Sequence, residues 1–107
     1  MSNRLHLREL LSTVGIPNLY FQPPENTKLK YPCLIYSLSH VQTNYANGKP
    51  YKISPQYFML LIDRDPDTQY LAPILQLPGC HFDRFYIADN LNHWAFTVHN
   101  TGTFPED

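Results

Sequence analysis

An uninterrupted run of six apolar residues, 57–62 (Tyr-Phe-Met-Leu-Leu-Ile), constrains the fold of this chain more than any other feature. A half-exposed strand alternates apolar and polar residues, whereas a strand covered on both sides is apolar throughout. An aspartate-rich turn follows the run. The short length of the apolar run is typical of a strand. We therefore predict a strand over residues 55–63, place it at the centre of a sheet, and expect both of its faces to be covered.

Size and composition favour one domain of mixed structure. A chain of 107 residues can bury a single core. Aromatic residues make up 14% of it and proline occurs 10 times, which favours strands and rigid loops over long helices. We expect a single α+β domain over residues 1–107. Its sheet is expected to be mixed or antiparallel, with an N-terminal helix and a second short helix packed on it.

The first fifteen residues predict the N-terminal helix. Leu7, Leu10, Leu11 and Val14 follow the i, i+3, i+4, i+7 spacing of one helical face. Gly15 supplies a stop, because glycine tolerates the left-handed conformation that ends helices. The helix is expected over about residues 3–14, followed by a short edge strand at residues 19–21.

The middle of the chain predicts a strand and then a long loop. Residues 33–40 form the strand, with Leu34, Tyr36 and Leu38 on its more buried face. Residues 41–54 are polar and contain a turn signal at residues 47–50 (Asn-Gly-Lys-Pro). They are expected to separate this strand from the central one.

The second half predicts a short helix and a hairpin. The helix is expected to begin near Pro73, because proline is tolerated only in the first turn. Residues 80–87 and 92–99 are expected to pair antiparallel, with Trp94, Phe96 and Val98 on the core face. Residues 100–107 are polar and are expected to form a loose tail.

Three alternating aspartates, Asp63, Asp65 and Asp67, resemble the start of a calcium-binding EF-hand loop. The match fails, because Thr68 stands where glycine is needed and Ile74 where glutamate is needed. We expect a turn in which Asp65 or Asp67 accepts backbone N–H groups, and regard a cation there as incidental.

No cysteine, histidine or carboxylate spacing meets a metal or catalytic template. Cys33 and Cys80 lack the close spacing of zinc ligands and are expected to be reduced and buried. His81, Asp83 and His93 could supply acid–base partners, but no nucleophile motif or phosphate loop accompanies them. In the simpler interpretation, His93 and Asp89 tie down the last hairpin. We predict no enzyme activity, no metal and no cofactor.

Charge and hydropathy bear on partners and location. The formal net charge is -1 with scattered basic residues, so no sequence-specific nucleic acid is expected as a ligand. No apolar run reaches the roughly 20 residues of a membrane-spanning helix, so no membrane partner is expected. The polar N-terminus lacks the features of a signal peptide, which predicts synthesis in a reducing cytoplasm.

Six residues are candidates for contacts with a neighbouring subunit or partner. Arg64 and Arg84 each follow an aspartate, with which they cannot pair within one strand, so each is expected to pair with an acidic residue within the domain or with a neighbouring subunit. Residues 41–51 are too long for a tight turn and carry aromatic and polar side chains. The candidates are Tyr45, Asn47, Lys49, Tyr51, Arg64 and Arg84.

Several segments together resemble small proteins encoded among the head–tail joining and tail genes of tailed phages. The similarity covers about residues 30–100 and consists mostly of turn and packing residues. The segments are residues 31–36 (Tyr-Pro-Cys-Leu-Ile-Tyr), 45–51 (Tyr-Ala-Asn-Gly-Lys-Pro-Tyr), 62–67 (Ile-Asp-Arg-Asp-Pro-Asp), 77–84 (Leu-Pro to Asp-Arg) and 89–93 (Asp-Asn-Leu-Asn-His).

The resemblance implies a structural virion protein of a long-tailed phage, made in the cytoplasm of a bacterial host and located in the neck or tail. It is similar to the tail terminator or tail-completion group, whose members form a hexameric ring that caps the tail tube protein and docks it to the head connector. Two alternatives stay open. One is a head-completion or adaptor protein on the portal side, and the other is a small ligand-binding or hydrolytic domain.

Overall fold

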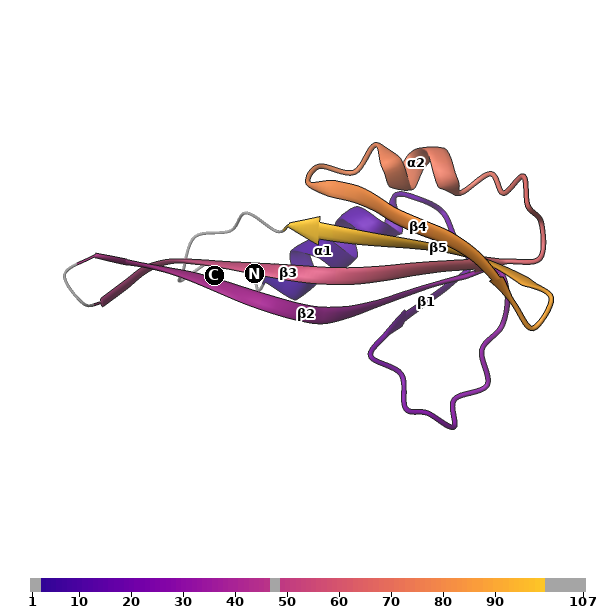
Figure 1. The fold of residues 1–107 in the computed structure, drawn as a ribbon, viewed down its shortest axis with the longest axis horizontal. Coiled ribbons are helices and arrows are strands. Elements are labelled where there is room, and N and C mark those ends of the chain that lie inside the picture. Colours follow the sequence, from indigo (N-terminus) through magenta and orange to yellow (C-terminus); the bar gives the residue numbers. More distant parts are fainter. Residues whose placement is uncertain (1–2, 47–48, 100–107) are drawn as a thin grey trace.

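The computed structural model describes residues 3–46 and 49–99, and for residues 3, 6, 40–46 and 49–54 it describes the backbone alone. The described part is a single α+β domain with one five-stranded sheet and two short helices (Figure 1). In chain order, the elements are α1 (Asn3–Ser12), β1 (Asn18–Phe21), β2 (Cys33–Ala46), β3 (Lys49–Asp63), α2 (Leu71–Leu75), β4 (Cys80–Ala88) and β5 (Leu91–His99).

The sheet is mixed, with the strand order β1-β2-β3-β5-β4. β1 runs parallel to β2, and the other three pairs of neighbours are antiparallel. The central position predicted for the apolar strand is confirmed, because β3 is the middle strand. The short strand β1 lies at one edge, as expected, and β4 lies at the other.

Helix α1 packs through the apolar stripe that predicted it. Leu7 and Leu11 are buried, and Val14 is buried just beyond the last helical residue. Gly15 has a φ of 85°, the left-handed conformation expected of a helix stop. The helix ends at Ser12, two residues before the predicted end, because Thr13 and Val14 form a turn closed by short-range bonds to the backbone.

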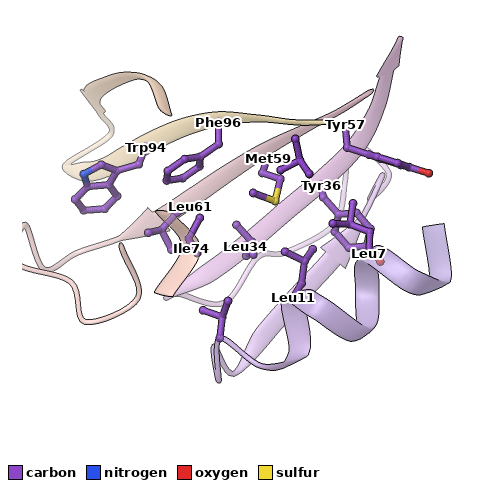
Figure 2. Close-up of a cluster of buried hydrophobic side chains, with 12 residues drawn as sticks. Leu7, Leu11, Leu34, Tyr36, Tyr57, Met59, Leu61, Ile74, Trp94 and Phe96 are labelled. Carbon is purple, nitrogen blue, oxygen red and sulfur yellow. The ribbon is translucent and has the colours of Figure 1, made fainter. Parts of the chain in front are cut away.

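The core lies between one face of the sheet and the two helices (Figure 2). Cross-strand pairing in β3 and β5 sets Leu61 opposite Trp94, Met59 opposite Phe96, and Tyr57 opposite Val98. All of these side chains are buried, which confirms the predicted core face of the last strand. α1 contributes Leu7 and Leu11 to the same cluster and α2 contributes Ile74, so both helices cover the same face.

The expectation that β3 is covered on both faces is wrong. On the face without helices, Phe58 is 38% exposed and Leu60 is only half-buried. This open face is fully covered only near the end of the strand, where Ile62 and its cross-strand neighbour Cys33 are buried. The apolar run at residues 57–62 therefore contributes one face of β3 to the core and leaves part of the other face as an exposed apolar surface.

The predicted loop at residues 41–54 is also wrong. β2 and β3 continue pairing from His40↔Gln56 to Ala46↔Lys49. Polar residues do not prevent this, because the hydrogen bonds of a ladder join backbone groups. The turn signal at Asn47 and Gly48 lies outside the described residues, between the two strands.

The last three elements agree with the sequence. α2 begins two residues before Pro73, which places the proline in the first turn, where its missing N–H costs nothing. β4 and β5 pair antiparallel around Asp89 and Asn90, whose φ angles of 55° and 62° are those of a type I′ hairpin turn. The expected loose tail, residues 100–107, lies outside the described residues. Neither described helix is long and apolar enough to cross a membrane.

Candidate interaction surface

A two-stranded ribbon extends beyond the rest of the sheet. β5 pairs with β3 only from Gln56 onward, and β1 pairs with β2 only up to Tyr36. Residues 40–55, which we call the arm, therefore consist of β2 and β3 paired with each other and with no third strand among the described residues. Figure 1 shows the arm reaching past the other elements at one end of the molecule, which measures 52 × 30 × 23 Å.

The arm begins at an irregularity in β2. The pairing shifts between Leu38 and His40, and the hydroxyl of Ser39 donates to the carbonyl of Gln56 at 3.0 Å. On the outer side of β2, the backbone N–H of Leu38 donates to the side-chain oxygen of Gln22 at 3.1 Å. Beyond that bond, β2 presents an unpaired backbone edge among the described residues.

Three of the predicted contact residues lie in the arm. Tyr45, Lys49 and Tyr51 are in its strands, where a second shift of register falls between Asn44 and Tyr45. Asn47 lies outside the described residues. The sequence thus identified a protruding segment, although it assigned a loop where the structure has strands.

Arg64 and Arg84 lie elsewhere, so the six predicted residues do not form one site. Arg64 follows Asp63, the end of β3 opposite the arm. Its guanidinium carbon lies 5.7 Å from the centroid of the Tyr31 ring. An Arg over an aromatic face is stabilised by the ring quadrupole. Neither arginine forms an ion pair with an acidic residue in the described part of the chain.

Arg84 belongs to a stack of side chains on the open face. Its guanidinium carbon lies 5.0 Å from the centroid of the Tyr86 ring. That ring is stacked on His93 of the neighbouring strand, with centroids 4.7 Å apart and an interplanar angle of 11°. The expected pairing of Arg64 and Arg84 with acidic residues within the domain is therefore not what the structure has among the described residues. Within the domain, each arginine lies over a tyrosine ring.

The free edge of β4 carries apolar side chains that the sequence did not single out. Phe82, Phe85 and Ile87 are 48%, 45% and 66% exposed. Phe82 contacts Phe96 and Phe85 contacts Trp94, so both phenylalanines lie on the helix-bearing face at the margin of the core. β5 is the only strand paired with β4 among the described residues.

A bulge at Asp83 places the two phenylalanines on one face. Residues three apart on a regular strand point to opposite faces. The register shifts between Phe82 and Arg84, which adds one residue and brings Phe85 round to the side of Phe82. The side chain of Asp83 accepts a hydrogen bond from Thr97 at 2.6 Å. In the sequence, the spacing of three between Phe82 and Phe85 within one predicted strand was the signal for this bulge.

The aspartate turn is formed as predicted. The carboxylate of Asp63 accepts from the backbone N–H of Asp65 at 3.0 Å, and that of Asp65 accepts from Asp67 at 2.9 Å. Asn92, buried beside it, donates to the carbonyls of Asp63 and Arg64 at 3.2 and 3.1 Å. These bonds fix the connection between β3 and β5. No group of three metal-ligating side chains occurs in the described residues.

The remaining polar candidates have separate neighbours. The Nδ1 atom of His93 lies 3.0 Å from the carbonyl of Leu91, as expected for a hairpin tie, whereas Asp89 contributes its left-handed backbone. The ring of His81 meets His99 edge-on, with centroids 5.6 Å apart.

Both cysteines are free thiols. Burial raises the pKa of Cys33 to about 11, with Asp63 adding to the shift. Burial likewise raises the pKa of Cys80 to about 11, with Asp83 adding to it. Because the thiolate is the reactive form, both thiols are weak nucleophiles at neutral pH.

Comparison with protein-family models, with curated proteins and with solved structures gives no match to this chain.

Proposed function

We propose that this chain is a non-enzymatic structural protein of a tailed-phage virion, a tail terminator or tail-completion subunit located in the neck or tail. In this role, copies assemble into a ring, expected to be a hexamer, that caps the tail tube and joins it to the head connector. The proposal combines the sequence resemblance over about residues 30–100 with the surfaces of the domain.

The arm is the observation that carries the proposal. An isolated two-stranded hairpin is at best marginally stable in water, because it lacks a core and leaves its outer backbone groups to solvent. A projecting hairpin is therefore expected where a partner completes it. In the described part, β2 and β3 pair only with each other from His40↔Gln56 to Ala46↔Lys49. A subunit that joins a ring to a tube supplies such partners.

The exposed apolar side chains support the same role. Large contiguous apolar patches on a folded domain mark surfaces that another molecule covers. Phe82, Phe85 and Ile87 are exposed along one edge strand of the sheet, β4. An enzyme of this size would need a constellation of converging polar groups. The described His81, Asp83 and His93 instead each have a separate neighbour.

A head-completion or adaptor protein on the portal side is the second candidate. It would use the same kinds of surface, so the arm favours neither position. The two differ in what their loss does to the tail. A terminator stops polymerisation of the tube, whereas an adaptor acts on the head.

The test deletes the gene for this chain from the phage that carries it and examines the particles by electron microscopy. A terminator predicts unjoined heads together with tails of unregulated length, both restored by the intact gene. Tails of normal length beside unjoined heads would assign the adaptor role. Normal infectious particles that lack the protein would contradict both.

A further inference from the structure

We propose that strand β4 of one copy pairs with the arm of the next copy, antiparallel to the outer edge of β2. The inference rests on the proposed ring and names the two surfaces that close it. Both surfaces are unpaired backbone edges in the described part of the chain, and they lie on opposite sides of the same sheet.

The length and the apolar side chains of β4 favour its pairing with another strand. Unused edges are usually short, charged, bulged or covered, because an exposed edge is a template for pairing with another chain. β4 has a bulge at Asp83 and two charged residues, Asp83 and Arg84. It is nonetheless nine residues long, and its helix-side residues Phe82, Phe85 and Ile87 are about half or more exposed. Pairing with a further strand would satisfy its outer backbone groups and cover these side chains together.

Strand direction favours the arm as the occupant. β2 and β5 run one way, and β3 and β4 run the other way. When copies are related by the rotation of a ring, β4 of one copy therefore meets β2 of the next in antiparallel orientation. Antiparallel ladders are the more stable kind. The contact is heterologous, so each copy uses its arm on one side and its β4 on the other, and repetition of this contact generates a ring when the rotation between copies closes.

Charge also matches the arm to a neighbour's body. Residues 40–55 contain Lys49 and Lys52 and no acidic residue, giving the arm +2. The other residues hold 6 of the 8 basic side chains and all 9 acidic ones, a formal charge of 6 − 9 = −3. Arms repel one another and are attracted to bodies, which favours contacts between arm and body over contacts between two arms.

Disulfide cross-linking tests the pairing in the full chain. In a Cys80→Ser background, Ile87→Cys is combined in turn with a cysteine at each of positions 40–46, because Cα atoms of opposed strand residues lie within disulfide range. At least one double variant should form a ladder of covalent oligomers under mild oxidation. Ile87→Cys alone should remain monomeric on a non-reducing gel.

The matched control is Phe58→Cys with the same arm cysteines, since Phe58 is also an exposed apolar residue but lies on the central strand. It should give no ladder. In light scattering, Ile87→Lys should raise the concentration at half-assembly at least tenfold with an unchanged melting temperature, whereas Phe58→Lys should not.

Three results would overturn the inference: dimers from Ile87→Cys alone, which would mean β4 paired with β4; no ladder from any double variant; or assembly unaffected by Ile87→Lys. None of them bears on the deletion phenotype, so this inference can fail while the proposed function stands.

Discussion

The body of the domain and its arm are built from the same two strands but are stabilised differently. Within the body, β2 and β3 bury Leu34, Tyr36, Met59 and Leu61 against both helices. In the arm, the same strands have only each other among the described residues. The body is therefore stabilised by its own buried side chains, whereas the arm depends on backbone pairing and on a partner that pairs with it. Stability and assembly should respond to different substitutions.

Phe96→Ala should have the largest effect on the body. Phe96 is fully buried between Met59 on one neighbouring strand and Phe82 on the other. Its truncation should lower the free energy of unfolding by about 3–5 kcal/mol, a large share of the roughly 5–15 kcal/mol of a typical domain. Denaturant unfolding measures the loss. Phe58→Ala is the control and should cost less, roughly 1–2 kcal/mol, because Phe58 is 38% exposed. Equal losses would mean that both faces of β3 are covered.

Gly79→Ala should come next, at more than about 2 kcal/mol. Gly79 has a φ of 75°, which costs an L-residue roughly 1–2 kcal/mol. An added Cβ would also lie 2.5 Å from the carbonyl oxygen of His99, where the two strands of the last hairpin meet. Gly15→Ala provides the comparison, because it has a φ of 85° and open space around the added Cβ. Thermal unfolding should show the smaller loss at Gly15, and the reverse order would contradict the close approach at Gly79.

Asn92→Ala should cost about 1–3 kcal/mol, because it leaves the carbonyls of Asp63 and Arg64 without their buried donor. Asn26→Ala, at an exposed position, should change the free energy of unfolding by no more than about 0.5 kcal/mol. Urea titration of the two variants measures the difference. A neutral Asn92→Ala would show that these bonds do not hold the β3–β5 connection.

Much of the body followed from patterns that are local in sequence. The leucine stripe of α1, the alternation of Trp94, Phe96 and Val98, and the turn at Asp89 and Asn90 each specify their own geometry. The geometry that such a pattern specifies depends on residues close in sequence and not on the neighbouring strands. These predictions were confirmed.

The surfaces could not be predicted in the same way. A continuous apolar run is the same whether the second face of its strand is covered by the chain or open, so the run alone predicts buried positions for Phe58 and Leu60. The polar residues of the arm predict a loop, because strands that pair only through their backbone groups need no alternation of apolar and polar side chains. The bulge at Asp83 shifts Phe85 to the other face of β4. The spacing of three between Phe82 and Phe85 is compatible with a bulge, but the pairing with β5 is needed to establish it.

Tyr45→Ala should have the smallest effect on the body. Tyr45 lies in the arm, opposite Pro50 and away from the pairing with β5. Its replacement should change the melting temperature by no more than about 2 °C, in line with a surface substitution. Ring formation and the yield of infectious particles should fall. A large drop in the melting temperature would place Tyr45 in the core.

Amide hydrogen exchange, measured on the monomer and on the assembled protein, tests directly whether the arm depends on a partner. Protection reflects the free energy of local opening, which is low for a ribbon without a third strand. Amides of residues 40–46, 49 and 51–54 should exchange rapidly in the monomer and become strongly protected on assembly, while those of residues 57–62 and 92–98 stay protected in both. An arm that is as protected in the monomer as the central strands would contradict the account.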